Sequence, residues 1–289
     1  MRCLRAMKIL RAKPRLRYVA DLRALGFLLT ALILEAGLWS GAIVPPLLAV
    51  ISCFMSFICC INAHNQMHLP VFRSQIWNSV YQLLLMFGSG QPPTGIITAH
   101  NERHHRQPNS KQDFVRTDLV CSQSNVINLI VFPFLSVAAM LREKPDDLAH
   151  WKVLRPHLYR QAVLERPVFY SVLLLLALLD WKSTLMFLVL PWLVAQLALV
   201  GVNLLQHQDC NTESEYDHSR NVTGTLANWF LLNNGYHTAH HLRPAMHWSL
   251  LPEFHRTQIV PQMNPVLDHD SFTGLIIERL RRPNISHAR

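Results

Sequence analysis

Two long apolar blocks stand out in the pattern of hydrophobic and polar positions along the chain. They cover residues 24–62 and 168–205, and each is nearly free of charged side chains. A helix needs about 20 apolar residues to cross the hydrocarbon core of a bilayer, so each block is long enough for two crossings. The pattern therefore predicts an all-α integral membrane protein whose transmembrane helices form two hairpins, with spans at about residues 24–40, 42–62, 166–182 and 184–205.

Each block contains a stretch where the chain can turn back. The first turn is expected at Trp39-Ser40-Gly41 or at Pro45-Pro46, and the second at Asp180-Trp181-Lys182. The charged residue of the first block is Glu35, close to the first turn. An acid inside a membrane is a functional candidate by default. Its place near the turn instead predicts a structural residue whose carboxylate reaches water at the membrane surface.

Two shorter apolar stretches are predicted to be helices that do not cross the membrane. Residues 76–87 are too few to span, and residues 126–141 have Pro133 in the middle. A helix that lies on the surface or inserts halfway suits both stretches better. If residues 126–141 crossed alone, polar segments before and after them would face opposite sides of the membrane.

Composition and charge agree with a membrane protein. Half of the residues are apolar, 16% are charged and the mean hydropathy is +0.15. Soluble domains carry about 25% charged residues, so these values exclude a disordered chain, a coiled coil and a nucleic-acid-binding tail. The net charge of +9 is concentrated in the basic arm of residues 1–23, directly before the first span. Positive segments of this kind stay cytoplasmic, which predicts cytoplasmic N- and C-termini.

The candidate chemistry lies in the histidines. Nine of the 16 histidines fall in four short clusters, within residues 64–68, 100–105, 203–207 and 237–241. Histidines four apart on a helix share one face and can converge on one metal ion. His64 and His68 have this spacing, and so do His100 and His104. The full set is His64, His68, His100, His104, His105, His207, His237, His240 and His241.

Nine imidazoles exceed the number that one ion accepts, so two metal ions are predicted. Adjacent histidines on a helix point about 100° apart. The neighbours His104 and His105, and likewise His240 and His241, are therefore expected to serve different ions. If each hairpin crosses out and back, all four clusters lie on the cytoplasmic face. His218 and His247 lie near the last cluster and could contact the ligands. Asp209, Asp113 and Glu102 could orient the ligands through their free N–H, but a solvated surface charge is the favoured interpretation of each.

The kind of metal follows from the donors. All-nitrogen ligation suits zinc, copper, iron or nickel. Hydrolytic zinc sites use His-Glu-x-x-His with the glutamate as general base, but here Glu102 is displaced by one position. Two redox metals beside a lipid-accessible helical bundle suit oxygen chemistry on a hydrocarbon chain. Removing hydrogen from an unactivated CH₂ group needs a metal–oxygen oxidant that side chains alone do not provide.

The histidine clusters resemble those of the membrane fatty acid desaturase superfamily. The matching residues are HNQMH at 64–68, HNERHH at 100–105 and HTAHH at 237–241, and NLLQH at 203–207 resembles an additional Asn-x-x-x-His element. The stretches NNGY at 233–236, PAMHW at 244–248 and DHSRN at 217–221 resemble the bacterial acyl-chain branch. The resemblance covers roughly residues 24–255, a membrane desaturase-like domain. Residues 256–289 are then a cytoplasmic C-terminal tail.

This resemblance carries expectations about fold and chemistry. It implies four transmembrane helices with a cytoplasmic helical cap that holds a di-iron site, the nine clustered histidines as iron ligands, and Asn203 holding a metal-bound water. Desaturation in this family uses O₂ and two electrons to convert two CH₂ groups to a double bond. The fatty acyl substrate would be a lipid, an acyl-CoA or an acyl carrier protein. The sequence contains no haem, flavin or nicotinamide fingerprint, so an external donor such as a ferredoxin or cytochrome is implied. A bacterial inner membrane is the expected location, and no nucleic acid is expected.

Other functions fit parts of the same pattern. A hydroxylase, ketolase or acetylenase could use the same ligands, because substrate placement rather than ligation separates these outcomes. A non-catalytic transporter or b-type cytochrome belongs to a different class. A cytochrome would place paired histidines within facing spans, and a transporter would need polar residues along its spans. No clustered histidine lies in the middle of a span, and polar residues apart from Glu35 are nearly absent from the spans. An oxidase acting on an acyl chain is therefore the favoured hypothesis.

Overall fold

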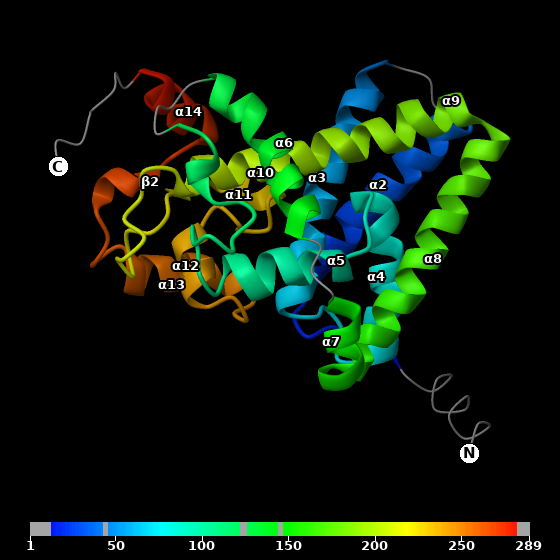
Figure 1. The fold of residues 1–289 in the computed structure, drawn as a ribbon, viewed down its shortest axis with the longest axis horizontal. Helices are drawn as coiled ribbons and strands as arrows, with labels where there is room; N and C mark the ends of the chain where they lie inside the picture. The colour runs from blue at the N-terminus through cyan, green and yellow to red at the C-terminus, as the bar shows by residue number, and fades with distance from the viewer. Residues whose placement is uncertain (1–12, 43–45, 122–125, 144–146, 282–289) are drawn as a thin grey trace. The chain divides into compact units, whose positions relative to one another are not determined.

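The computed structural model describes residues 13–42, 46–121, 126–143 and 147–281 (Figure 1). The chain forms two compact units: unit 1, residues 1–97 and 146–196, and unit 2, residues 98–145 and 197–289. The protein is an all-α membrane protein, apart from one two-stranded sheet in the described part. Within that part, the helices long and apolar enough to cross a membrane are Asp21–Trp39 (α2), Pro46–His68 (α3), Pro156–Leu179 (α8) and Trp181–His207. The last of these runs through Trp181–Thr184 (α9), Leu185–Val189 (η3) and Leu190–His207 (α10).

In unit 1, α2 and α3 form the first hairpin and pack along each other. The N–H of Ser40 donates to the carbonyl of Ala36 at 3.0 Å, which closes the last turn of α2. Gly41 follows with φ +72°, the left-handed conformation in which helices commonly end. The chain therefore turns after Trp39, at the first of the two predicted places. Residues 43–45, which include Pro45 of the second place, lie outside the described residues. The helix Gln75–Ser89 (α4) packs on α3.

Contrary to the prediction, the carboxylate of Glu35 does not reach water. The side chain is 3% exposed and accepts hydrogen bonds from Ser56 Oγ at 2.9 Å and Trp192 Nε1 at 3.1 Å. Facing helices supply these donors, and a buried carboxylate without donors would be costly. The prediction was wrong because the donors lie 21 and 157 residues away in sequence. Glu35 thus joins three helices of unit 1 through hydrogen bonds.

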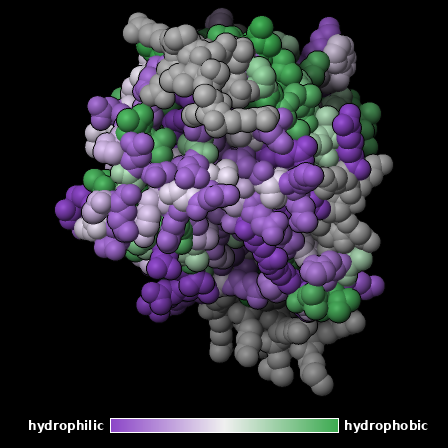
Figure 2. All heavy atoms as spheres, turned by 60° about the vertical axis from the view of Figure 1, so that its left-hand side comes forward, coloured by the Kyte–Doolittle hydropathy of each residue, from purple (hydrophilic) through white to green (hydrophobic). Residues whose placement is uncertain are grey.

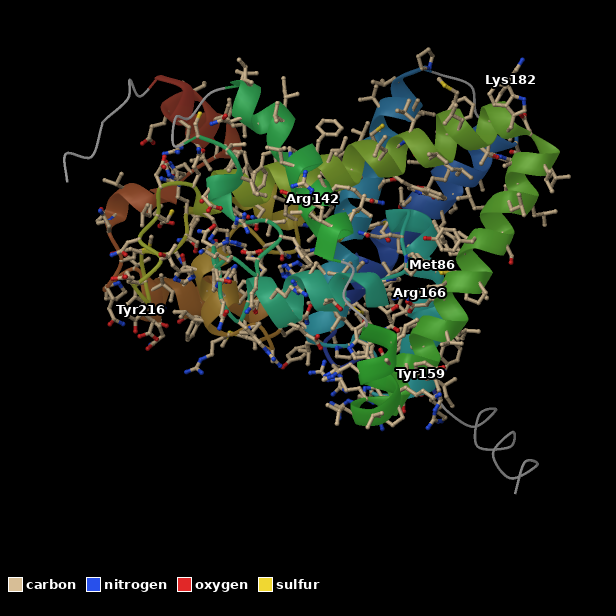
Figure 3. All side chains as sticks on the ribbon, in the orientation of Figure 1. Met86, Arg142, Tyr159, Arg166, Lys182 and Tyr216 are labelled. Atoms are coloured by element: carbon tan, nitrogen blue, oxygen red, sulfur yellow. The ribbon has the colours of Figure 1, made fainter. Side chains whose placement is uncertain are left out.

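The second hairpin turns at the predicted stretch. The Asp180 carboxylate accepts hydrogen bonds from the N–H groups of Lys182 at 3.0 Å and Ser183 at 3.1 Å, which caps the start of α9. Lys182 lies at the tip of this hairpin and points outward, whereas Met86 lies in a buried cluster with Phe169 and Trp192 (Figure 3). The short polar cap thus separates two apolar helices.

Helix α8 begins about ten residues before the predicted span at 166–182. Proline occupies its first position at Pro156, where the missing N–H costs nothing. The early turns are held from outside the helix, because the buried Glu165 carboxylate accepts from Thr94 N at 3.1 Å and Thr94 Oγ1 at 2.7 Å. Thr94 starts the short helix Thr94–Ile96 (α5), and Asp147–Leu154 (α7) also packs on α8. The exact membrane boundaries of the spans stay predictions.

In unit 2, the helix Val126–Glu143 (α6) has one buried and one exposed face. Asn128, Phe132 and Ser136, each four residues apart, are buried. The exposed face carries large apolar side chains, including Ile127 at 70% and Phe134 at 58% exposed. Its described apolar stretch is shorter than the four candidate spans. Whether this helix lies along the membrane surface or inserts halfway, as the sequence suggests, stays a prediction.

The C-terminal residues of unit 2 are packed against its core. Asp268–His269 (β2) pairs in parallel with Asn221–Val222 (β1), with Asn221 opposite Asp268. The helix Phe272–Arg281 (α14) buries Leu275 against Leu205 and Val222. The segment after residue 255, expected as a tail, therefore supports the end of α10, and residues 282–289 lie outside the described residues.

The remaining elements of unit 2 are short. They are Ile97–His104 (η1), Thr117–Leu119 (η2), Thr225–Phe230 (α11), His237–Leu242 (α12), Trp248–Leu250 (η4), Leu251–Phe254 (α13), His255–Ile259 (η5) and Pro265–Leu267 (η6). Hydrophilic side chains gather over the centre of the face that Figure 2 turns towards the viewer. On α13 and η5, Glu253 and Arg256 form an exposed ion pair.

Candidate metal centre

A wide helical turn positions the first three histidines of unit 2. Element η1 is a π-helix, in which the N–H of His105 donates to the carbonyl of His100 at 2.9 Å. This hydrogen bond spans five residues and brings His100 and His105 together, with their Nε2 atoms 2.9 Å apart. The sequence suggested an α-helical step from His100 to His104 instead. Single π-turns inside helices are frequent at functional sites, because they re-aim one side chain.

Two further helices supply the remaining histidines of this unit. His207 is the last residue of α10 and is 1% exposed. In α12, His237 and His241 share one face, with their Nε2 atoms 3.1 Å apart. His237 Nε2 is also 2.8 Å from His207 Nε2, whereas His240 Nε2 is 3.1 Å from His105 Nε2.

These contacts sort seven histidines of unit 2 into two sets. The four-histidine set is His104, His207, His237 and His241, whose ligand atoms all lie within 4.8 Å of one another. The three-histidine set is His100, His105 and His240, which meet the same limit. Each adjacent pair is divided, since His104 and His105, and likewise His240 and His241, belong to different sets.

The two histidines of unit 1 form a pair of their own. His64 and His68 lie one turn apart at the end of α3, with ring centroids 4.9 Å apart and planes at 58°. Their ligand atoms lie within 4.8 Å of each other. The α-helical spacing of this cluster thus gives the convergence that the sequence predicts for it.

The four-histidine set is suited to a cation because its hydrogen positions leave nitrogen lone pairs facing inward. His104 Nδ1 lies 2.8 Å from Asp113 Oδ2, and His207 Nδ1 lies 3.1 Å from the carbonyl oxygen of His218. A carboxylate and a carbonyl only accept, so both Nδ1 atoms donate and both Nε2 atoms carry lone pairs. Among the described residues, the buried His104 Nε2 has no hydrogen-bond partner. A metal ion would satisfy these atoms.

The protonation state of the set agrees with metal binding. Burial, together with neighbouring histidines, holds the pKa of His237 and of His241 well below the usual value. Both imidazoles are therefore neutral near pH 7, the form that binds a metal ion. The four neutral imidazoles of the set can therefore bind one metal ion without a carboxylate ligand.

Asp113 is the acid that contacts a candidate ligand directly. Besides His104, its carboxylate accepts from the N–H groups of Asn109 and Val115, both at 3.0 Å. It is 1% exposed, although the sequence alone also fits a solvated surface charge. Because the loop folds around the carboxylate, Asp113 fixes both the ring of His104 and the path of residues 109–115.

Other candidates named from the sequence have different partners in unit 2. Asp209 pairs with Arg279 of α14, and Asn203 Nδ2 donates to the carbonyl of Val115 at 3.2 Å. His247 Nδ1 lies 2.7 Å from Ser249 Oγ, at the start of η4. Glu102 is half-buried in η1. His218 lies beside the four-histidine set, with its ring centroid 5.3 Å from that of His241.

Sequence reasoning missed the residue that anchors α12. The Asn221 side chain accepts from Thr238 N at 2.9 Å and donates to Thr238 Oγ1 at 3.0 Å, and all of these groups are buried. This ties β1 to the helix that carries three histidines. The available signal was the stretch DHSRN at 217–221, which ends on Asn221. Its role depends on a partner 17 residues away, which spacing does not reveal.

Gly235 offers a test of how tightly α12 is placed. A Cβ at Gly235 would lie 2.1 Å from the Val222 carbonyl oxygen and 2.6 Å from Asn228 Oδ1. Gly235→Ala must therefore displace the chain just before His237, and we expect it to cost about 1–3 kcal/mol of stability and to lower metal content. Thermal unfolding and metal analysis measure this. Gly201→Ala is the control, because nothing lies within 4 Å of that position; equal behaviour of the two variants would contradict the prediction.

Comparison with known families identifies the kind of protein. The family model described as fatty acid desaturase matches residues 38–270, most of the chain. The chain belongs to the fatty acid desaturase family. No curated protein matches the sequence. The matched range contains all nine clustered histidines, and membership makes this desaturase-family chain an oxidoreductase that acts on fatty acyl chains.

Proposed function

We propose that this protein is a di-iron desaturase, which introduces a C=C bond into a fatty acyl chain. The observation that carries the proposal is the four-histidine set of unit 2, in which hydrogen bonds to Nδ1 leave the Nε2 lone pairs of His104 and His207 directed inward. Family membership supplies the class of substrate. Beyond family membership, we propose iron as the metal, a C=C bond as the product and an external protein as the electron donor.

The ligands are proposed as two groups. One iron is held by the four-histidine set. The other is held by the three-histidine set, and the family resemblance implies His64 and His68 as further iron ligands. Asn203 is proposed to hold a metal-bound water through its side-chain oxygen, since its Nδ2 donates to Val115. Asp113 and the carbonyl of His218 orient His104 and His207 by accepting hydrogen bonds from their Nδ1 atoms.

Iron is favoured over a hydrolytic zinc site. The proposed donors are all imidazoles, and the sequence lacks the His-Glu-x-x-His pattern in which glutamate serves as the base. A di-iron centre with O₂ supplies the oxidising power to remove hydrogen from unactivated CH₂ groups, chemistry that side chains do not provide. The chain's own residues bind and orient the centre and keep its imidazoles neutral.

The overall reaction balances with one external reductant. The segment –CH₂–CH₂– and O₂, with two electrons and two protons, give –CH=CH– and two molecules of water. Both oxygen atoms leave as water, and the acyl chain loses two hydrogens. An external ferredoxin or cytochrome is the proposed electron donor, and a lipid, an acyl-CoA or an acyl carrier protein presents the chain.

The proposed location is the bacterial inner membrane, with both termini in the cytoplasm. Two hairpins that cross out and back return the chain to its starting side. The basic arm of residues 1–23 supports this orientation, because positive segments stay cytoplasmic. The polar surface on unit 2 suits an aqueous compartment (Figure 2). The softer matches at 217–221, 233–236 and 244–248 support the bacterial acyl-chain branch.

Product analysis in cells tests the proposal. A bacterial host that produces the protein under air is expected to accumulate an unsaturated fatty acid that is absent without O₂ and absent with His207→Ala. Mass spectrometry after derivatisation locates the double bond. The purified protein should hold about two irons and show no Soret band. A hydroxylated, keto or alkyne product would show that the protein carries out that oxidation instead of desaturation. A haem spectrum would contradict the proposal altogether.

A further inference from the structure

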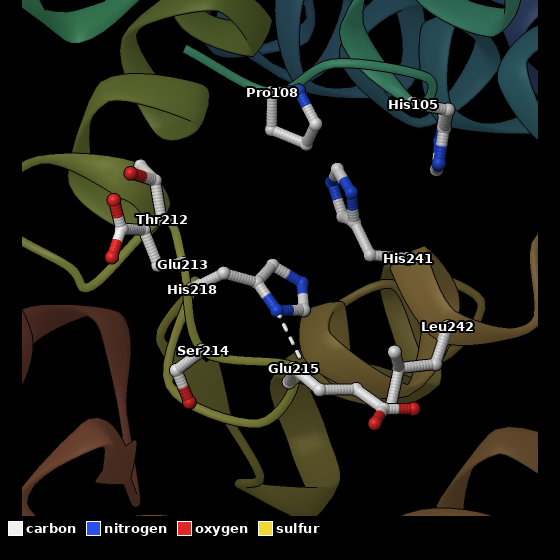
Figure 4. A pocket seen from close by; sticks show the side chains of 9 residues that line it. All are labelled: His105, Pro108, Thr212, Glu213, Ser214, Glu215, His218, His241 and Leu242. Atoms are coloured by element: carbon white, nitrogen blue, oxygen red, sulfur yellow. Dashed lines mark hydrogen bonds between the residues drawn. The ribbon is translucent and has the colours of Figure 1, made fainter.

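A tenth histidine, His218, lies next to the four-histidine set in unit 2. It belongs to the loop between α10 and β1 and is 7% exposed. Together with His105 and His241 it lines a pocket, and its ring faces His241 across that pocket (Figure 4). Neither the family match nor the nine clustered histidines assign it a role.

The hydrogen position on His218 is determined by its surroundings. Its Nδ1 lies 2.9 Å from the carbonyl oxygen of Glu215, drawn as the dashed line in Figure 4. The carbonyl only accepts, so Nδ1 donates and Nε2 carries a lone pair. Within the described part of the chain, this Nε2 is buried and has no hydrogen-bond partner. Burial also lowers the pKa of His218, which keeps the ring neutral.

The placement of the ring is that of a ligand opposite another ligand. The centroids of His218 and His207 are 6.5 Å apart, with planes at 24°. The pair His100 and His240, which share one set, has centroids 6.3 Å apart and planes at 11°. Two nearly parallel rings at this distance can face one ion from opposite sides, although the ligand atom of His218 does not lie within 4.8 Å of all four ligand atoms of the set. The ring of His218 is therefore placed relative to that of His207 much as the ring of His240 is placed relative to that of His100.

The loop that carries His218 is fastened to both neighbouring helices. The carbonyl of His218 accepts from His207 Nδ1, and Ser219 Oγ lies 2.9 Å from Thr238 Oγ1, next to His237. Arg220, the following residue, is buried and donates to the carbonyls of Leu205 and Gln208 at the end of α10. A ring held this way keeps its position when the set binds an ion.

We propose that His218 is a tenth nitrogen donor of the centre and binds the ion held by His104, His207, His237 and His241. This inference rests on the proposed function, since it requires a metal ion in the four-histidine set. It raises the protein ligands of that ion to five imidazoles. The side of the ion nearest the pocket is then closed by His218.

The test replaces His218 and observes the metal directly. The full-length protein is purified in detergent, freed of iron and loaded with cobalt(II), whose visible bands strengthen as its coordination number falls. His218→Ala is expected to strengthen the bands of one of the two ions and to speed its release to a chelator by about 10–100-fold. Added imidazole should restore the wild-type spectrum, because the lost ring leaves a space open to the pocket. His218→Gln is a second variant of similar size.

The matched control is His255→Ala, which removes another buried imidazole of unit 2. If His218→Ala and His218→Gln keep the wild-type bands and release rate, or change them only as His255→Ala does, His218 is not a donor. Wild-type protein that takes up two cobalt ions beside such unchanged variants overturns this inference alone. Wild-type protein that takes up no metal overturns the proposed function.

Discussion

Replacing His240 and His241 together with alanine is expected to empty both metal sites and to abolish product formation. The two residues are adjacent in α12 but belong to different sets, with His240 Nε2 3.1 Å from His105 and His241 Nε2 3.1 Å from His237. One double substitution thus removes a ligand from each ion. Loss of groups that only orient ligands already costs 10–100-fold, so we expect activity to fall by more than about 100-fold.

Metal analysis of detergent-purified protein measures this effect directly. About two irons per chain are expected in the wild type and almost none in the double variant. His157→Ala is the matched control, since His157 is an exposed histidine at the start of α8 and lies in unit 1. It should retain both irons and full turnover. A double variant that keeps its iron and its turnover would show that these imidazoles are not ligands.

Replacing Asp113 is expected to have the second-largest effect. The buried carboxylate accepts from His104 Nδ1 at 2.8 Å and from the N–H groups of Asn109 and Val115. Asp113→Ala frees the ring of His104 and leaves two backbone donors without their acceptor. Orienting carboxylates of this kind are worth 10–100-fold in metal affinity or activity, and we expect a loss of about that size.

Asp113→Asn separates the two contributions of the carboxylate. The amide oxygen can still accept from His104 and from the N–H of Asn109, whereas the amide NH₂ cannot accept from the N–H of Val115. Most of the loop is therefore expected to persist while the negative charge beside His104 is lost. Iron affinity and circular dichroism report the two effects independently. Asp118→Asn is the control, because Asp118 is 72% exposed and pairs with Arg116 on the surface. An Asp113→Ala protein with wild-type iron affinity would argue that His104 needs no orienting partner.

Much of the fold could be predicted from the apolar pattern, and some of it could not. The four long helices and the turn at Asp180 follow from runs of apolar residues and one polar interruption. The surroundings of Glu35 did not follow, since Ser56 and Trp192 come from other helices. The packing of residues 256–281 was also missed, because a two-residue strand leaves too short a signal.

The candidate site could likewise be predicted from the sequence only in part. Spacing of four residues placed His64 beside His68, because an α-helix repeats every 3.6 residues. For residues 237–241 the sequence suggested the three-residue step from His237 to His240, whereas the Nε2 atom of His237 lies 3.1 Å from that of His241. The π-turn at residues 97–104 breaks that rule and pairs His100 with His105. No local pattern distinguishes such a turn from an ordinary helix.

The features that the sequence by itself determined depend on residues that lie close together in the chain. Apolar run length, positive charge before the first run and the count of clustered histidines are local properties, and they led to a four-span membrane protein with a metal-binding histidine cluster. Which ring faces which depends on packing between segments far apart in the chain. Only the tertiary structure joins His104 to His207 and His241, gives His104 its acid in Asp113, and places His218 opposite His207.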